Sequence, residues 1–311
     1  MINLYNPQYE GLYLALITSY LLGIVHGVTP DEHTWPITFS YSVGSYSMKG
    51  GFRSGLVFSS GFTLQRAFLA EIAYLSLAGI FMTAAAFGLT YVAVGVAMAA
   101  AGLYIYFRKT NFHIHIISHY MERLSGIHQK HPEQEYMENI HKVNPVMHDM
   151  KPIPARMAFI HGLIAGFGFG AFALIIYTVL APSMPNVYIA FLPGLLFGLG
   201  TMTMQIIFGM VFGSWMGRKK NLTKEGIEYV ARSISRNTLF YGGIAFVISG
   251  IIILMFPQIL NLAIITPIKV HNLHGLGIGF FIVIFAVLIV GVVSYFRAMK
   301  KVLSSGNNNI S

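Results

Sequence analysis

Two histidines and two carboxylates lie close together near the start of the chain, in the stretch VHGVTPDEHTWP at residues 25–36. They are His26, Asp31, Glu32 and His33. Imidazole nitrogens and carboxylate oxygens together suit borderline divalent ions such as Ni²⁺, Co²⁺, Zn²⁺ or Fe²⁺. We therefore predict that His26, Asp31 and His33 bind such an ion directly. Glu32 is predicted to be a further ligand or a residue that supports the ligands.

These residues can meet only if the helix that carries them is interrupted. In one unbroken helix, His26 and His33 would lie about 10.5 Å apart along the axis, and Asp31 would point away from His33. The Thr-Pro-Asp-Glu sequence at residues 29–32 fits a new helix start, with Thr29 as N-cap, and Pro36 disrupts a helix that continues through it. The competing interpretation is that the carboxylates merely cap a half-helix.

The composition of the whole chain is typical of a membrane protein. Of the 311 residues, 55% are hydrophobic and only 10% are charged, against about 25% charged in soluble domains. We predict an all-α polytopic membrane protein in the cell membrane, surrounded by a lipid bilayer. Ionisable groups inside a membrane span are rare and by default mark an ion or proton path. The chain has no cysteine, which excludes thiolate metal sites and thiol redox chemistry.

Hydrophobic runs of sufficient length predict about seven transmembrane helices. Nearly all lysine and arginine residues then fall on one side of the bilayer, which the positive-inside rule makes cytoplasmic. The N-terminus is expected outside and the C-terminus inside. The net charge of +9 is thereby explained without nucleic-acid binding. The predicted spans are 11–46 (interrupted), 54–80, 84–107, 155–181, 187–216, 237–256 and 273–297.

Two parts of the chain resemble each other, which predicts an inverted 3+3 repeat with broken helices plus one extra helix. IVHGV at 24–28 matches FIHGL at 159–163, and GLVFSSGFTLQ at 55–65 matches GLLFGLGTMTMQ at 194–205. Such repeats are a recurring transporter design, with the substrate site at the repeat interface. His161, the counterpart of His26, is a further candidate ligand. The predicted parts are 1–107 (first repeat), 108–153 (cytoplasmic loop), 154–256 (second repeat), 257–303 (final span) and 304–311 (disordered tail).

The loop at 108–153 holds seven of the twelve histidines. His115 and His119 are four residues apart, so they would share one face of a helix. Neutral imidazoles in such a loop would capture divalent ions weakly and in a pH-dependent way; a solvated linker with incidental histidines is the alternative. The loop residues we assign as candidate metal ligands are His113, His115, His119, His128 and His131.

The pattern at the predicted break resembles the nickel/cobalt transporter superfamily. The signature of that family is a histidine, four residues, then Asp-His. In this chain His26 is followed by four residues and Asp31, and Glu32 stands between Asp31 and His33. The resemblance implies a secondary transporter of Ni²⁺ or Co²⁺ with His26, Asp31 and His33 at its ion site.

We therefore expect secondary transport of a divalent transition-metal ion, possible coupling to protons, and no enzymatic activity. The metal ion is the transported substrate, and no resident cofactor is expected. Either a homo-oligomer or a partner membrane subunit is compatible with the sequence. Two other functions stay open: a carrier of small anions or other solutes built on a related three-plus-three fold, and a membrane redox protein with histidine-ligated haem.

Overall fold

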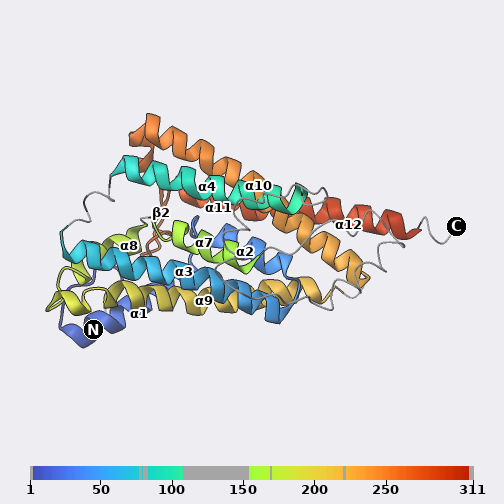
Figure 1. The fold of residues 1–311 in the computed structure, drawn as a ribbon. Coiled ribbons are helices and arrows are strands. Elements are labelled where there is room, and N and C mark those ends of the chain that lie inside the picture. The colour runs from blue at the N-terminus through green and yellow to red at the C-terminus, as the bar shows by residue number, and fades with distance from the viewer. Residues whose placement is uncertain are drawn as a thin grey trace, which may run out of the picture.

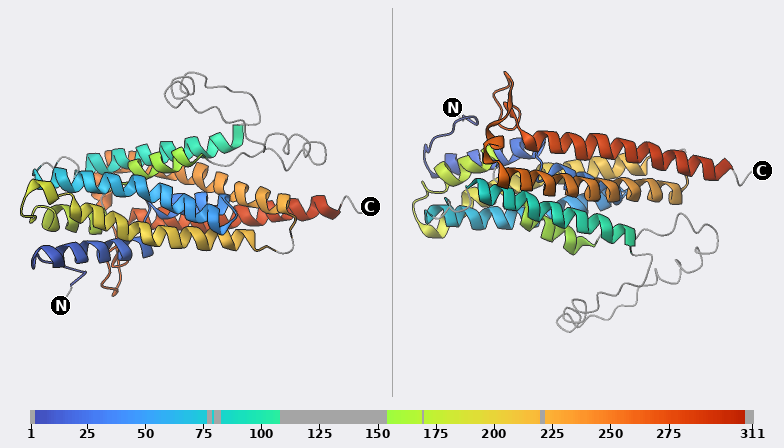
Figure 2. Two further views of the ribbon diagram at one scale, coloured as in Figure 1. Left: turned by 60° about the horizontal axis from the view of Figure 1, so that its bottom comes forward. Right: turned by 90° about the horizontal axis from the view of Figure 1, so that it is seen from above.

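The computed structural model describes residues 3–76, 79, 83–107, 154–168, 170–219 and 222–307, and most of these are helical. The long helices run roughly along one common axis, with the two termini at opposite ends of the bundle (Figures 1 and 2). The helices are α1 (Leu12–Val28), α2 (Trp35–Gly44), α3 (Met48–Tyr74), α4 (Ala84–Phe107), α7 (Ala155–Ala165), α8 (Ala171–Ile175), η2 (Ile176–Leu180), η3 (Val187–Ile189), α9 (Leu192–Gly217), α10 (Lys224–Met255), η4 (Pro257–Asn261), α11 (Ile278–Val283), η5 (Ile284–Val290) and α12 (Gly291–Asn307).

The first long segment is interrupted as predicted, but the second helix begins later than the sequence indicates. Thr29 is the C-cap of α1, and its extended backbone leads into a non-helical stretch. Helix α2 starts at Trp35, with Thr34 as N-cap. The predicted helix start at Thr29 and Pro30 is therefore wrong. Pro36 falls in the first turn of α2, where its missing N–H group costs nothing, so it does not bend a continuing helix.

The glycine-rich stretch at 166–170 interrupts the fourth predicted span in a similar way. Helix α7 ends at Ala165, and α8 begins at Ala171 and continues into the π-helical turn η2. Gly170 has an extended backbone at this break. Both interruptions contain buried residues, such as Asp31 in the first and Gly168 in the second. The helices that flank them, α2, α7 and α8, lie between the two ends of the bundle (Figure 1).

Glycines allow the central helices to approach so closely that no side chain would fit between them. On α3, Gly51 lies against the backbone carbonyl of Gly209 on α9, and Gly55 lies against that of Gln205. Helices α4 and α10 are packed in the same manner, with Gly95 against the carbonyl of Gly243. A methyl group at any of these glycines would collide with backbone, so the helix spacing depends on them.

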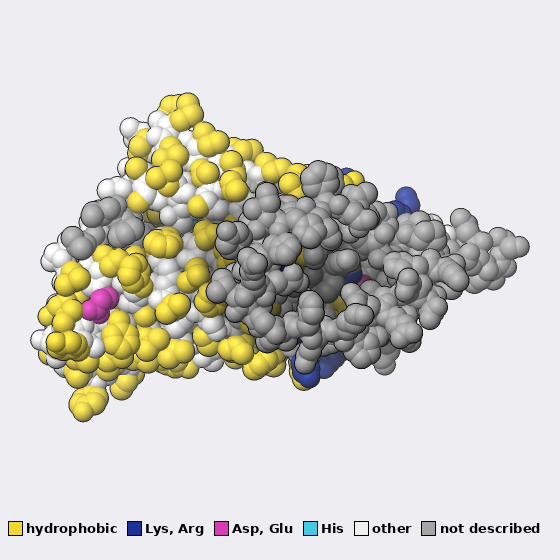
Figure 3. All heavy atoms as spheres, viewed as in Figure 1, with side chains coloured by type: hydrophobic (Ala, Val, Ile, Leu, Met, Phe, Trp, Pro, Cys, Tyr) yellow, Lys and Arg dark blue, Asp and Glu magenta, His cyan; other side chains and the backbone are white. Residues whose placement is uncertain are grey.

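Four helical stretches in the described part of the chain are long and apolar enough to cross a membrane by length and composition: Ala84–Tyr106, Val187–Gly217, Lys224–Met255 and Ile278–Ser304. Their outward faces are apolar as well. On α4, for example, the exposed side chains Leu89, Val96 and Leu103 recur every seven residues. Figure 3 shows hydrophobic side chains covering much of the visible described surface, with lysine and arginine only toward one end. These features support an all-α membrane protein.

The last part of the chain differs from the predictions in detail. Helix α10 begins at Lys224 rather than near 237, so Arg232 is inside the helix. The side chain of Arg232 is buried and paired with Glu228 one turn earlier, which compensates its charge. The short strands β1 (Ile264–Ile265) and β2 (Gly275–Leu276) pair in antiparallel fashion between η4 and α11. Helix α12 extends to Asn307, past the predicted start of the disordered tail at 304.

Candidate metal site

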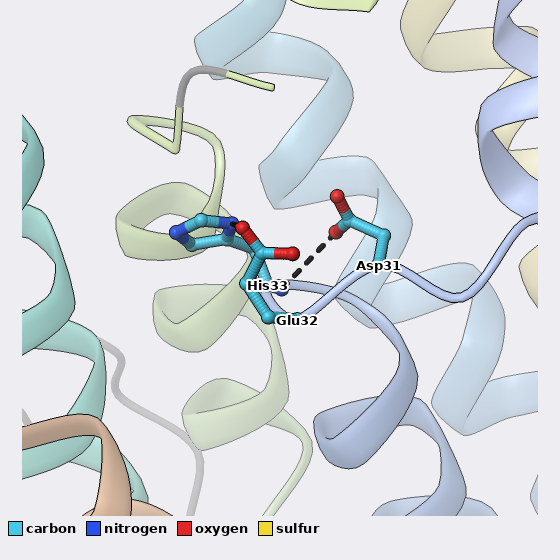
Figure 4. A group of neighbouring side chains, drawn as sticks. All are labelled: Asp31, Glu32 and His33. Carbon is cyan, nitrogen blue, oxygen red and sulfur yellow. Dashed lines mark hydrogen bonds and ion pairs between the residues drawn. The ribbon is translucent and has the colours of Figure 1, made fainter. Parts of the chain in front are cut away.

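Asp31 lies in the interruption between α1 and α2 and uses its two carboxylate oxygens differently. The Oδ1 atom accepts hydrogen bonds from the backbone N–H groups of His33 and Thr34, both at 3.1 Å, and from the Thr34 hydroxyl at 3.2 Å. This arrangement caps the start of α2, as an aspartate commonly does at a turn (Figure 4). The Oδ2 atom faces His26, whose Nδ1 lies 3.8 Å away. Asp31 is therefore a structural cap on one side and a free ligand on the other.

Glu32 and His33 complete a compact group with Asp31. One ligand atom from each of the three residues can be chosen so that all lie within 4.8 Å of one another. The Nδ1 atom of His33 is 3.4 Å from Oε1 of Glu32, and the same oxygen accepts a hydrogen bond of 2.8 Å from the Tyr91 hydroxyl on α4. The His33 and Glu32 side chains lie close together in Figure 4, with the Asp31 carboxylate beside them.

His26 approaches this group from the last turn of α1. Its side chain is 1% exposed, and neither ring nitrogen has a hydrogen-bond partner. Three phenylalanine rings surround the imidazole, with centroid distances of 5.1–6.0 Å to Phe197, Phe172 and Phe62. A buried imidazole without a partner is unfavourable, because it loses its hydrogen bonds to water. Its nitrogen is thus available to a metal ion shared with Asp31.

The second interruption packs directly against the first. A Cβ atom on Gly168 would collide with the imidazole ring of His33, and one on Gly279 at the start of α11 would collide with the Glu32 carboxylate. Both glycines are therefore needed for the observed approach. The carbonyl of Gly168 accepts a hydrogen bond of 2.7 Å from Nη2 of Arg66, which is fully buried in α3. Arg66 thereby fixes the chain at the second break.

The distances in the cluster are close to those of a coordination sphere. Two donor atoms that each lie about 2.1 Å from one ion are at most about 4.2 Å apart. Three donors arranged evenly around one ion at that distance are about 3.6 Å apart, so the Asp31, Glu32 and His33 atoms, which lie within 4.8 Å of one another, would need to close by about 1 Å to bind one ion together. The helix geometry that would separate Asp31 from His33 does not apply, since residues 31–34 are not helical. The compact group can thus offer one nitrogen and two oxygen donors, and His26 lies next to it, with its Nδ1 3.8 Å from Oδ2 of Asp31.

The other predicted site residues are distributed differently. The structure does not bring His161 into the compact group. Its Nδ1 lies 2.7 Å from the hydroxyl of Tyr41 on α2, a hydrogen bond that satisfies the buried imidazole. The predicted loop ligands His113, His115, His119, His128 and His131 lie outside the described residues.

Several residues at the site were not predicted from the sequence. Tyr91 and Gly279 come from distant helices, and nothing in their local sequence indicates a role. Gly168 lies in the GFGFGAF stretch, whose glycines did indicate a second break or a close helix approach. No family model, no curated protein and no solved structure matches this chain. The function of this chain is therefore inferred from its residues and their geometry.

Proposed function

We propose that this protein is a secondary transporter for a divalent transition-metal ion, with Ni²⁺ or Co²⁺ as the first candidates. The observation that carries the proposal is the buried group of His26, Asp31, Glu32 and His33 at an interrupted helix. The resemblance of this stretch to the nickel/cobalt transporter superfamily agrees with it. In the proposal all four residues are ligands, and His161 is a structural residue that positions α7 against α2.

The electrostatics of the cluster favour a cation. Two adjacent carboxylates are buried or nearly buried here, which is costly unless a positive charge compensates them. Arg66 does not fill this role through an ion pair, since its guanidinium donates to the Tyr177 hydroxyl and to the Gly168 carbonyl. A divalent ion would neutralise both carboxylates and also use the unpartnered histidine nitrogens. A neutral solute would leave these charges uncompensated.

We further propose that the chain is a seven-span inverted repeat, in which α1–α2 and α7–α8–η2 are the broken spans. Reciprocal glycine contacts support this: two contacts between the halves each have a counterpart in which both residue numbers differ by 139. With this constant difference, Gly162 corresponds to Gly23 and not to Gly27, which is one helical turn further along α1. The pair His161-Gly162 is therefore not equivalent to the pair His26-Gly27 in the repeat. The reciprocal contacts are Gly55 with Gln205, Gly194 with Arg66, Gly23 with Phe197, and Gly162 with Phe58.

The orientation of this bundle follows from its basic residues. Lys49 and Arg53 lie in the first turns of α3, Lys224 begins α10, and Lys300 and Lys301 lie in the second half of α12. These ends of the three helices point to the same end of the bundle in Figure 1. Under the positive-inside rule this supports a cytoplasmic location for that end, and we propose that the N-terminus is outside and that residues 108–153 form a cytoplasmic loop.

The test is ion flux into liposomes that contain the purified protein, measured with Ni²⁺ and Co²⁺ and with a pH gradient in each direction. We expect flux in the wild type and at least a tenfold reduction in His26→Ala. His161→Gln is the matched control, because it changes a buried histidine whose Nδ1 bonds to the Tyr41 hydroxyl and which is not part of the compact group. Its flux should stay near that of the wild type. Absence of flux in the wild type with both ions would contradict the proposal. Metal-independent flux of small anions would then favour the alternative carrier.

A further inference from the structure

One face of helix α2 carries hydroxyl groups that begin at the metal cluster and continue along the helix. Thr34, Thr38 and Ser42 are spaced four residues apart and so share a face. The Thr34 hydroxyl donates to Asp31, as described above. The hydroxyls of Thr38 and Ser42 are buried and have no hydrogen-bond partner. Ser40, on the opposite face, differs: its hydroxyl donates to the backbone carbonyl of Pro36 at 2.6 Å.

Helices α9 and α10 pack against α2 and also carry buried polar groups without hydrogen-bond partners. Ser42 Oγ faces α9, where a Cβ atom added to Gly209 would lie 3.2 Å from it. Gln205 is one turn before Gly209 on α9, is fully buried, and has no partner for either amide atom. On α10, Ser235 Oγ would lie 2.9 Å from a Cβ atom on Gly44, and it too is unpartnered.

Helices α2 and α9 run in the same direction where they pack together, so their polar groups succeed one another along α2. Trp35 packs on Phe208 and Phe39 packs on Phe212, which shows that α2 and α9 advance together. The polar groups therefore continue from the cluster toward the end of α2 at Gly44. Most buried hydrogen-bonding groups in proteins have partners, so a row without them calls for an explanation such as water or an ion.

Just beyond the end of α2, a charged contact joins the loop after it to α10. The Tyr46 hydroxyl donates to Glu228 at 3.2 Å, and Glu228 also pairs with Arg232. Arg232 is three residues before Ser235 on α10, so the contact lies next to the last polar group of the row.

We propose that Thr34, Thr38, Ser42, Gln205 and Ser235 form the route by which a partly hydrated divalent cation passes between the metal cluster and the cytoplasmic end of α2. This inference rests on the proposed function and adds the path and its residues. Neutral hydroxyl and amide oxygens can replace part of the hydration shell of the ion without holding it tightly. An ion can therefore leave the charged cluster along them.

The absence of cysteine makes this route directly testable by thiol labelling. Thr38→Cys and Ser42→Cys place a thiol on the proposed route, and Ser40→Cys places one on the opposite face of the same helix. The protein in liposomes is treated with a membrane-impermeant thiol reagent under transport conditions, and labelling is measured by mass spectrometry. Since all three positions are buried, labelling reports conformations in which water has access. Melting temperatures check that each variant is folded, and Ser42→Cys against Ser40→Cys suffices if Thr38→Cys does not fold.

We expect the two route variants to be labelled at least tenfold faster than Ser40→Cys. Co²⁺ should slow that labelling at least threefold, and the effect should disappear when Asp31→Asn is added. Equal labelling of all three positions would overturn the route. If Thr38→Cys and Ser42→Cys are labelled faster than Ser40→Cys but Co²⁺ does not slow the labelling, the route is open to water and is not used by the cation. Failure of the proposed function is detected separately, by the absence of metal flux in wild-type liposomes.

Discussion

The two oxygens of Asp31 have different surroundings, which predicts different effects for two substitutions at this residue. The Oδ1 atom accepts three hydrogen bonds that shape the start of α2, whereas Oδ2 lies 3.8 Å from Nδ1 of His26. Asp31→Asn keeps an oxygen acceptor for the cap and replaces the outward oxygen by an amide nitrogen, which cannot bind a cation. Asp31→Ala removes both functions.

The stability difference between these variants can be worked out from the hydrogen bonds. Each bond contributes about 0.5–1.5 kcal/mol net, so loss of all three in Asp31→Ala should cost about 2–4 kcal/mol. Asp31→Asn loses mainly the favourable charge near the helix N-terminus, worth about 0.3–1 kcal/mol. At roughly 2 °C per kcal/mol for a chain of this size, the melting temperature should fall by about 4–8 °C for alanine and about 2 °C or less for asparagine.

Metal affinity should depend on the Oδ2 atom of Asp31 and not on Oδ1. Loss of a group that only supports a ligand costs about 10–100-fold in affinity, so loss of the ligand itself should cost at least that much in both variants. The measurements are thermal unfolding in detergent and calorimetric titration with Ni²⁺ and Co²⁺. Glu71 lies near the end of α3 and is not part of the compact group, so Glu71→Gln is the control for the exchange of carboxylate for amide and should leave binding unchanged. Wild-type affinity in Asp31→Asn, or equal destabilisation by both substitutions, would refute this division of roles.

Two further predictions concern residues that surround the ligands. Gly168→Ala should weaken Ni²⁺ binding at least tenfold in a calorimetric titration, because its methyl group would displace the His33 ring. Gly277→Ala, whose methyl group would meet only the Leu262 carbonyl at 3.7 Å, should bind as the wild type does. Equal affinities in the two glycine variants would disprove the role of this close approach. Tyr91→Phe removes the hydrogen bond to Glu32 and should weaken binding about 10–100-fold, as other losses of outer hydrogen bonds to metal ligands do. An unchanged titration would show that Glu32 needs no such support.

The sequence by itself determined the class of protein and the members of the cluster that are local in the chain. Long apolar runs with few charges require a helical membrane protein, because only internally hydrogen-bonded elements are stable in hydrocarbon. Asp31, Glu32 and His33 are neighbours in sequence, and Pro30 and Pro36 flank them. An interruption there was therefore predictable, and the structure has one between Val28 and Trp35.

The exact course of the break depended on the tertiary structure. Thr29 and Pro30 have the residue types of a helix start, yet α2 begins at Trp35, after Asp31 has accepted the hydrogen bonds of the turn. The packing of Gly168 on the His33 ring and of Gly279 on the Glu32 carboxylate holds these residues in the turn before α2. The start of α10 was misplaced for a similar reason: Arg232 is tolerated inside the bundle only because Glu228 pairs with it.

Only the tertiary structure decided which distant residues complete the site. Tyr91, Gly168 and Gly279 come from three separate segments, and their contacts with Glu32 and His33 depend on how those segments pack. Sequence similarity also suggested that His161 is equivalent to His26, but the partner of each histidine is set by the neighbouring helices. His161 meets the Tyr41 hydroxyl, whereas His26 meets the Asp31 carboxylate. Residue type fixes which bonds a side chain can make, and packing decides which of them it makes.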